Sequence, residues 1–180
     1  EYDTGVWYAD KRLGEIFDKL REQGIYEDTA IIISSDHGES LGELGSYCEH
    51  GEADAIVTHI PMIIKWPGCA KNAESNGFHY HLDLLSTLID LLGGVPEFKA
   101  NRVTGKVTPF DYDGESYADL VRTGEDGGRE YLVVSQCAHV CQRGVRFGDW
   151  MYIRTYHDGY HLNEADELFN LKDDPHEQHN

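Results

Sequence analysis

The feature that most constrains this sequence is a short apolar run that ends abruptly in ionisable side chains. Residues 29–35 are mostly β-branched, and seven positions are too few for a helix but suit a strand buried on both faces of a parallel sheet. The segment Asp36-His37-Gly38-Glu39 follows at once. In open α/β sheets, ligands bind beyond the carboxyl ends of the strands. We therefore treat this segment as the first candidate for a functional site.

Asp36 and His37 together could supply two ligands to a divalent cation, one a carboxylate oxygen and the other an imidazole nitrogen. The glycines that follow, at positions 38, 42, 45 and 51, would allow the backbone to approach a bound anion closely. The spacing alone leaves a second reading open. In that reading the segment is a polar loop after a buried strand, and Asp36 caps the next turn.

Length and charge limit the possible functions. The chain has 180 residues, enough for one compact domain with a core. Its formal net charge of −18 repels nucleic acid and anionic membranes, so we expect neither as a partner. No apolar run approaches the roughly 18 residues that a membrane span needs. An anionic substrate would require local compensation from a metal, arginine, lysine or protonated histidine.

The four cysteines do not form a C-x-x-C pair, and four in a chain of this size do not make a disulfide scaffold. The redox compartment, and with it the localisation, therefore stays unknown. The chain begins at Glu1 with no methionine or signal peptide, so we expect it to be part of a longer protein.

Hydrophobic periodicity predicts an α/β fold for the first 96 residues and antiparallel strands for the last 50. We expect domain 1–130 to be the α/β part and 131–180 an antiparallel subdomain. An amphipathic helix at 82–92 should place its leucines in the core, and Gly148-Asp149 should close a hairpin. The other expected helices are one at 7–23, ended by Gly24, and a short one at 52–58. Further strands are expected at 60–66, 131–135 and 167–171. Irregular chain should fill 97–130, apart from a short helix at 117–122.

Five segments, in order, resemble the sulfatase family of the alkaline-phosphatase-like superfamily. The first is Asp28-Thr-Ala-Ile-Ile-Ile-Ser-Ser-Asp-His-Gly-Glu-Ser-Leu-Gly-Glu43, which resembles the family's metal-binding strand. The others are Ile60-Pro-Met-Ile-Ile-Lys-Trp-Pro-Gly68, Leu82-Asp-Leu-Leu-Ser-Thr-Leu-Ile-Asp-Leu-Leu-Gly93, Asp113-Gly-Glu-Ser116 and Glu167-Leu-Phe-Asn-Leu-Lys-Asp-Asp-Pro-His-Glu-Gln178. This resemblance implies a partial alkaline-phosphatase-like mixed sheet with flanking helices, plus a small antiparallel C-terminal sheet.

The resemblance also implies a sulfuric ester hydrolase whose substrate is a sulfated small molecule or carbohydrate. It makes Asp36 and His37 ligands of a divalent metal that holds the sulfate. Calcium is the metal the family implies, with magnesium or manganese as alternatives, whereas imidazole ligation by itself favours manganese or zinc. The family commonly contacts the sulfate through a lysine, and here His50 occupies the corresponding position. A protonated imidazole could do similar work.

One departure from the family pattern is large. The family nucleophile is a cysteine or serine matured to formylglycine within Cys/Ser-x-Pro-x-Arg, and this sequence contains no such segment. The early acidic metal ligands also have no counterpart. We therefore expect the C-terminal portion of a sulfatase, inactive alone, whose partner is the missing N-terminal half of the same protein. Without that half the chain should expose apolar surface and could self-associate.

Two further groups could line a substrate pocket. The first is His139 with Arg143, a natural oxyanion partner, and the second is His157 with His161. The alternative for both is ordinary hairpin and loop surface.

Two other functions stay open at this stage. A phosphomonoester or phosphodiester hydrolase of the same superfamily would share the Asp-His metal chemistry. A non-catalytic acidic binding module would have lost it. The nucleophile upstream would discriminate among these three functions.

Overall fold

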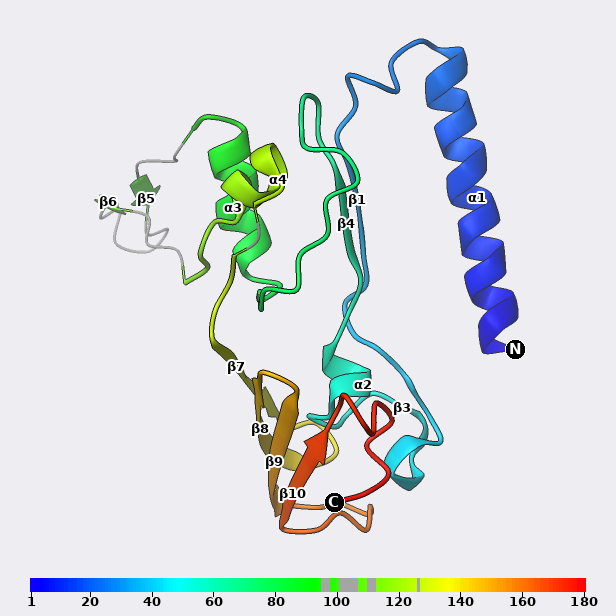
Figure 1. The fold of residues 1–180 in the computed structure, drawn as a ribbon, viewed down its shortest axis with the longest axis vertical. Coiled ribbons are helices and arrows are strands. Elements are labelled where there is room, and N and C mark those ends of the chain that lie inside the picture. The colour runs from blue at the N-terminus through cyan, green and yellow to red at the C-terminus, as the bar shows by residue number, and fades with distance from the viewer. Residues whose placement is uncertain (95–97, 101–106, 110–112, 126) are drawn as a thin grey trace.

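The structure is a computed structural model that describes residues 1–94, 98–100, 107–109, 113–125 and 127–180 (Figure 1). The helices are α1 (Tyr2–Glu22), η1 (Glu43–Gly45, 3₁₀), α2 (Ala55–Thr58), α3 (Asp83–Leu91) and α4 (Ala118–Thr123). The strands are β1 (Ile31–Ser34), β2 (Ser40–Leu41), β3 (Tyr47–Glu49), β4 (Met62–Lys65), β5 (Phe98–Ala100), β6 (Val107–Pro109), β7 (Tyr131–Gln136), β8 (Cys141–Phe147), β9 (Trp150–His157) and β10 (Asp166–Asn170). None of the helices in these ranges is long and apolar enough to cross a membrane.

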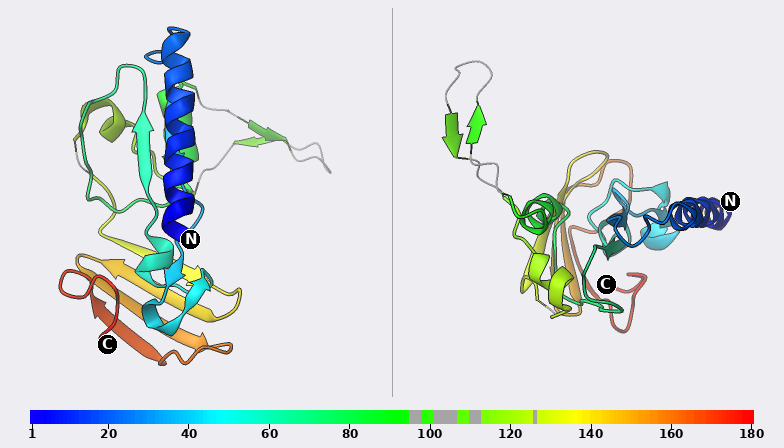
Figure 2. Two further views of the ribbon diagram at one scale, coloured as in Figure 1. Left: turned by 90° about the vertical axis from the view of Figure 1, so that its right-hand side faces the viewer. Right: turned by 90° about the horizontal axis from the view of Figure 1, so that it is seen from above.

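Helix α1 confirms the first predicted helix, although it begins at Tyr2. Gly24 follows it with a left-handed φ of 72°, the conformation expected of a C-terminal glycine. The helix buries none of its residues and stands to the side of the other elements (Figures 1 and 2). Its link to them runs through Tyr26, whose ring lies 4.4 Å from the Arg21 guanidinium and 4.7 Å from the Lys65 ammonium.

Strand β1 corrects the prediction of a parallel sheet buried on both faces. It is half-buried, and it pairs with β4 in antiparallel register from Ile31↔Lys65 to Ser34↔Met62. A parallel partner would require a crossover of a dozen or more residues that returns the chain to the start of β1. Here β2, β3 and α2 all lie beyond one end of the ladder, so β4 enters from that end and runs back.

Helix α3 is present as predicted, and Gly93 follows it with a φ of 69°. The prediction that its leucines form a core is wrong for the chain as described, because Leu85 is 51% exposed and Leu92 73% exposed. The buried side chains are instead Asp83 and Thr87. Backbone amides of the loop before α4 donate to both side chains, and Arg129, which follows α4, pairs with Asp83.

Asp83 is the central group of that polar face. It forms an ion pair with Arg129 and accepts hydrogen bonds from the backbone amides of Tyr80 (2.7 Å) and Glu115 (2.8 Å). Burial works to raise the pKa of this carboxyl, but Arg129 and the two amides outweigh it and hold the pKa below its usual range.

The last four strands form an antiparallel sheet in the order β10-β9-β8-β7. The predicted hairpin is confirmed: β8 and β9 pair from Phe147↔Trp150 onward, and Gly148 in the turn has a φ of 48°. Helix α4 and strands β4, β7 and β10 also lie within two residues of their predicted bounds. The sheet and the loop before α2 share a small core of Ala53, Met151, Ile153 and Phe169.

The irregular chain predicted for 97–130 is only partly within the described residues. Strands β5 and β6 pair there from Phe98↔Pro109 to Ala100↔Val107, a short hairpin that the sequence did not predict. Residues 97, 101–106, 110–112 and 126 lie outside the described part. The domain border near residue 130 falls between α4 and β7 and stays a prediction.

Helix α2 joins the two halves of the chain. Asp54 caps it by accepting a hydrogen bond from the Val57 amide at 2.9 Å. Both carboxylate oxygens of Glu177 lie within hydrogen-bond reach of the Ala55 amide, at 3.2 and 3.1 Å. The helix is therefore held by a residue 122 positions further along the chain.

Candidate metal and sulfate site

The turn that carries Asp36 and His37 is seated on α2. The Gly38 amide donates a 2.8 Å hydrogen bond to the Val57 carbonyl. A Cβ atom added at Gly38 would lie 2.0 Å from the Ile56 carbonyl oxygen, a distance that no side chain can occupy. Glycine is therefore required at this position for the turn to reach the helix, and the contact places both candidate ligands beyond the end of β1.

Asp36 presents its carboxylate to solvent, with a side chain that is 88% exposed. Its Oδ1 accepts a hydrogen bond from the His37 amide at 3.1 Å. Backbone hydrogen bonding and the neighbouring imidazole of His37 hold the pKa of this carboxyl below its usual range. The group is therefore an anion with free lone pairs at neutral pH.

His37 has a defined tautomer. Its Nδ1 lies 2.8 Å from the Gly38 carbonyl oxygen, and because a carbonyl can only accept, Nδ1 carries the hydrogen. In the neutral ring the other nitrogen, Nε2, keeps its lone pair, and it lies 3.7 Å from Asp36 Oδ2. A backbone carbonyl that orients an imidazole in this way is the usual support of a metal-ligating histidine.

His50 lies against His37, although the two are thirteen positions apart in sequence. The two rings stack with centroids 4.1 Å apart and an interplanar angle of 15°. His50 Nδ1 is 3.2 Å from Glu39 Oε2, which holds the second ring in place. The structure thus brings together three of the sequence-predicted residues, Asp36, His37 and His50.

Glu39 is the residue that sequence reasoning left out of the site. His37, Glu39 and His50 each offer one ligand atom, and these atoms all lie within 4.8 Å of one another. Ligand atoms around a tetrahedral zinc-sized ion lie about 3.4 Å apart, so small side-chain rotations would close the group around a cation. The sequence places Glu39 two residues after His37, but its nearness to His50 is created only by the folded loop.

His139 and Arg143 occupy different surroundings. His139 Nδ1 lies 3.0 Å from Glu49 Oε2, beside the segment that carries His50. Arg143 lies within β8, opposite Ser135 on β7 and Arg154 on β9, with its side chain exposed. Among the described residues no hydrogen bond or ion pair joins Arg143 to His50 or to the Asp36–His37 turn.

The second predicted pair, His157 and His161, also lies apart from the Asp36–His37 turn. His157 Nδ1 accepts a hydrogen bond from the Gly159 amide at 2.8 Å, so this histidine shapes a turn. His161 is largely buried, with Nδ1 3.4 Å from Ser46 Oγ and 3.8 Å from Glu52 Oε1. Neither histidine contacts His37 or His50 in the described structure.

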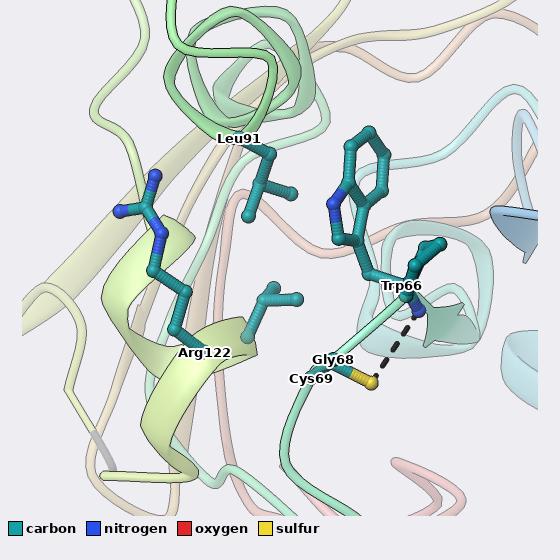
Figure 3. Close-up of a pocket in the computed structure, with 7 residues that line it drawn as sticks. Trp66, Gly68, Cys69, Leu91 and Arg122 are labelled. Carbon is teal, nitrogen blue, oxygen red and sulfur yellow. Dashed lines mark hydrogen bonds between the residues drawn. The ribbon is translucent and has the colours of Figure 1, made fainter. Parts of the chain in front are cut away.

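A cavity of about 210 Å³ lies at the other end of the β1–β4 ladder (Figure 3). Trp66 and Cys69 form one wall, where the Trp66 amide donates to Cys69 Sγ at 3.4 Å. On the opposite wall Arg122 pairs with Asp90 at 3.1 Å. The cavity contains none of the candidate ligands, so it is separate from the Asp36–His37 turn.

The model of the sulfatase family matches residues 1–95, more than half of the chain and the whole of the turn just described. The chain belongs to the sulfatase family. A sulfatase relative, the choline-sulfatase of Rhizobium meliloti (strain 1021), is 29% identical over 180 residues, which cover 97% of this chain and 31% of that protein. The chain thus spans about a third of the length of such curated relatives.

Solved structures confirm the alkaline-phosphatase-like α/β fold of this sulfatase-family chain. A structure described as a 2-O GAG sulfatase superposes with a TM-score of 0.70 at 24% identity, covering 96% of this chain and 35% of that one. The phosphonate monoester hydrolase of Silicibacter pomeroyi superposes with a TM-score of 0.67 at 22% identity, covering 91% and 32%. At these identities the likeness establishes the fold alone.

Proposed function

We propose that this chain is the part of a metal-dependent sulfuric ester hydrolase that supplies two metal ligands and a sulfate contact. Asp36 and His37 bind the cation, and His50 contacts the sulfate. The observation that carries the proposal is the hydrogen bond from His37 Nδ1 to the Gly38 carbonyl, which leaves Nε2 beside Asp36 Oδ2 at 3.7 Å. Within the sulfatase family, an oriented imidazole next to an ionised carboxylate is a suitable pair of ligands.

The cation, when bound, would stabilise negative charge on the sulfate oxygens. The residues of this chain would position the metal ligands and the sulfate contact. Gly38 seats the turn on α2, and Glu39 holds His50 Nδ1 at 3.2 Å, so that Nε2 of His50 is the atom left to face the substrate. When the ring is protonated, Nε2–H can donate to a sulfate oxygen. Because the rings of His37 and His50 stack at 4.1 Å, a cation bound at His37 and a sulfate bound at His50 would lie next to each other.

The donor set also bears on which metal binds. A carboxylate oxygen suits calcium, magnesium or manganese, and an imidazole nitrogen suits manganese or zinc better than calcium. We propose calcium from the family resemblance, with magnesium or manganese as the alternatives. The substrate would be a sulfated small molecule or carbohydrate.

The nucleophile is proposed to lie outside this sequence. Family members use a cysteine or serine matured to formylglycine in Cys/Ser-x-Pro-x-Arg, and none of the 180 residues forms that segment. The 180-residue chain alone should therefore bind metal weakly and hydrolyse no sulfate ester. The missing N-terminal half would complete the site.

The test is Asp36→Ala in the intact gene product that contains this chain. We expect loss of bound divalent metal and a fall of about 100-fold or more in the turnover of an aryl sulfate ester. The matched control is Asp28→Ala, at the other end of β1, which should retain both. Unaltered metal content and unaltered turnover in the Asp36 variant would overturn the proposal.

A second candidate function is hydrolysis of phosphate or phosphonate esters, favoured by the structural likeness to the phosphonate monoester hydrolase. The same Asp36 and His37 ligands would serve it. Parallel assays with an aryl sulfate and an aryl phosphate discriminate between the two. A protein that binds no metal and turns over neither ester would instead be the non-catalytic acidic module.

A further inference from the structure

Two of the four cysteines face each other at the open end of the C-terminal sheet. Cys137 Sγ lies 3.3 Å from Cys141 Sγ. The β7–β8 ladder ends at the pair Gln136↔Gln142, so these cysteines occupy the next cross-strand position. Directly opposed residues of antiparallel strands have Cα atoms about 4.5–5.5 Å apart, within the range that a disulfide spans.

The turn between the cysteines is built to keep them opposed. The Gln136 side chain accepts hydrogen bonds from the Cys137 amide at 2.8 Å and from the Ala138 amide at 2.9 Å. Val140, just before Cys141, is buried. Cys137 is exposed and Cys141 half-exposed, so small molecules in solution can reach the pair.

We propose that Cys137 and Cys141 form a reversible dithiol–disulfide pair that takes a low-molecular-mass disulfide of the glutathione class as its oxidant. The oxidised pair staples the turn between β7 and β8. Cys48 and Cys69 lie in other parts of the chain and remain single thiols.

The exchange balances as two successive displacements. The Cys137 thiolate attacks glutathione disulfide, forms a mixed disulfide and releases one glutathione thiolate. The Cys141 thiol then gives its proton to water, attacks the Cys137 sulfur and releases the second glutathione. Two protein thiols are oxidised while one small disulfide is reduced to two thiols.

The order of attack follows from the two environments. Cys137 is exposed and Cys141 only half-exposed, so the small disulfide reaches Cys137 first. The hydrogen bond with Cys137, with burial next, also raises the pKa of the Cys141 thiol. Once Cys137 carries glutathione, that hydrogen bond is gone, and Cys141 becomes free to resolve the mixed disulfide.

The stapled turn also carries a contact to the segment that holds His50. His139, at the tip of the turn, places Nδ1 3.0 Å from Glu49 Oε2, and a Cβ at Gly51 would lie 3.4 Å from the same ring. Forming the bond shortens the Sγ–Sγ distance from 3.3 Å to about 2.0 Å. The oxidised turn is therefore expected to hold His139 more rigidly against the Glu49–Gly51 segment.

The experiment treats the intact protein with glutathione disulfide, alkylates the remaining thiols and maps every cysteine by mass spectrometry. We expect the peptide with Cys137 and Cys141 to lose two hydrogens and to lose both alkylation sites, and dithiothreitol to restore them. In Cys141→Ser, Cys137 should retain a glutathione adduct because nothing resolves it. Cys69→Ser is the matched control and should leave the disulfide unchanged.

Two results would overturn the proposal. One is independent glutathione adducts on both Cys137 and Cys141, and the other is free thiols at both under conditions that modify Cys48. The coupling to the His50 segment is tested by amide hydrogen exchange of residues 49–51, expected to slow on oxidation in the native protein and not in Cys141→Ser. The coupling would be refuted if oxidation changed the exchange of residues 49–51 equally in the native protein and in Cys141→Ser. None of these measurements depends on sulfatase activity.

Discussion

At the scale of single residues, the hydrogen-bond partners of the two stacked histidines decide which ring atoms remain for chemistry. His37 donates from Nδ1 to a carbonyl, and His50 places Nδ1 against the carboxylate of Glu39. In both rings these contacts leave Nε2 as the other ring nitrogen, and in the proposed function it faces a cation at His37 and an anion at His50. Glu39 contributes to this arrangement as a positioning residue.

Glu39→Gln tests that role. A glutamine can donate as well as accept, so it no longer fixes the tautomer of His50. We expect turnover of an aryl sulfate by the intact protein to fall about 10- to 100-fold while bound metal is retained. Glu74→Gln, on the exposed loop before α3, is the control. Loss of metal in the Glu39 variant would contradict this role and place Glu39 among the ligands.

The sequence was informative at this scale only where chemistry and position coincide. Asp36 and His37 could be selected because they follow an apolar strand directly, and His50 because the family places a cation there. Glu39 could not be selected, because its role depends on a contact with His50 eleven residues away that only the folded loop creates. The exposure of the Arg143 side chain likewise could not be predicted, because it depends on how β8 pairs with β7 and β9.

At the scale of elements, α2 is short but supports the site. It buries Ala55 and Val57, receives the Gly38 amide on its carbonyl side, and is capped by Asp54. Burial, together with the charge of Glu52, raises the pKa of Asp54 to about 6. Burial, together with the charge of Asp54, raises the pKa of Glu177 to about 8. Each of the two carboxyls thus keeps its proton to a higher pH than it would in an unfolded chain.

A pH dependence of stability follows from these shifts. An unfolded Glu177 would ionise near the ordinary glutamate pKa of 4.5, whereas the folded residue keeps its proton until about pH 8. The folded state binds more protons in this window, so the free energy of unfolding is highest below it and falls as pH rises through it. Thermal midpoints measured across the window should therefore decrease.

Glu177→Gln isolates the source of that decrease. Its side-chain oxygen still accepts from the Ala55 amide but cannot ionise, so the variant should lose less stability between pH 4.5 and about pH 8 than the parent. Glu130→Gln, at an exposed position, should follow the parent. A Glu177 variant with the parent's slope would assign the pH dependence to other groups.

Elements were predictable where they depend on neighbours in sequence. The β8–β9 hairpin needs only Gly148 in the turn and alternating side chains on both arms, and α3 needs only its apolar period. The direction of β1 was not predictable in the same way, because the pattern of Ile31 to Ile33 is equally compatible with parallel and antiparallel neighbours. Its partner is decided by where the chain between β1 and β4 returns.

At the scale of the whole molecule, apolar side chains remain uncovered on one group of elements. Trp7 on α1 is 63% exposed, Ile63 on β4 58% exposed and Leu85 on α3 51% exposed. Exposed apolar surface of this kind promotes association unless another segment covers it. The predicted leucine core of α3 was wrong for this reason, since amphipathic pattern identifies an apolar face but not what packs on it.

The 180-residue chain, expressed alone, should therefore self-associate as its concentration rises, despite its charge of −18. Trp7→Glu or Ile63→Glu should shift it toward monomer in sedimentation velocity. Leu162→Glu, at a side chain that is 99% exposed between β9 and β10, is the matched control and should have little effect. If the chain stayed monomeric at every concentration, the exposed apolar surface around Trp7 and Ile63 would not drive self-association.

The hydrogen bond from the Ala55 amide to Glu177 also affects when the site can form during synthesis of the chain. The two residues are 122 positions apart, so the ribosome completes the Asp36–His37 turn long before it makes the carboxylate that anchors the helix beneath it. Until residue 177 leaves the ribosomal exit tunnel, helix α2 beneath the turn lacks its hydrogen bond to Glu177. The site thus matures only after Glu177 has been made.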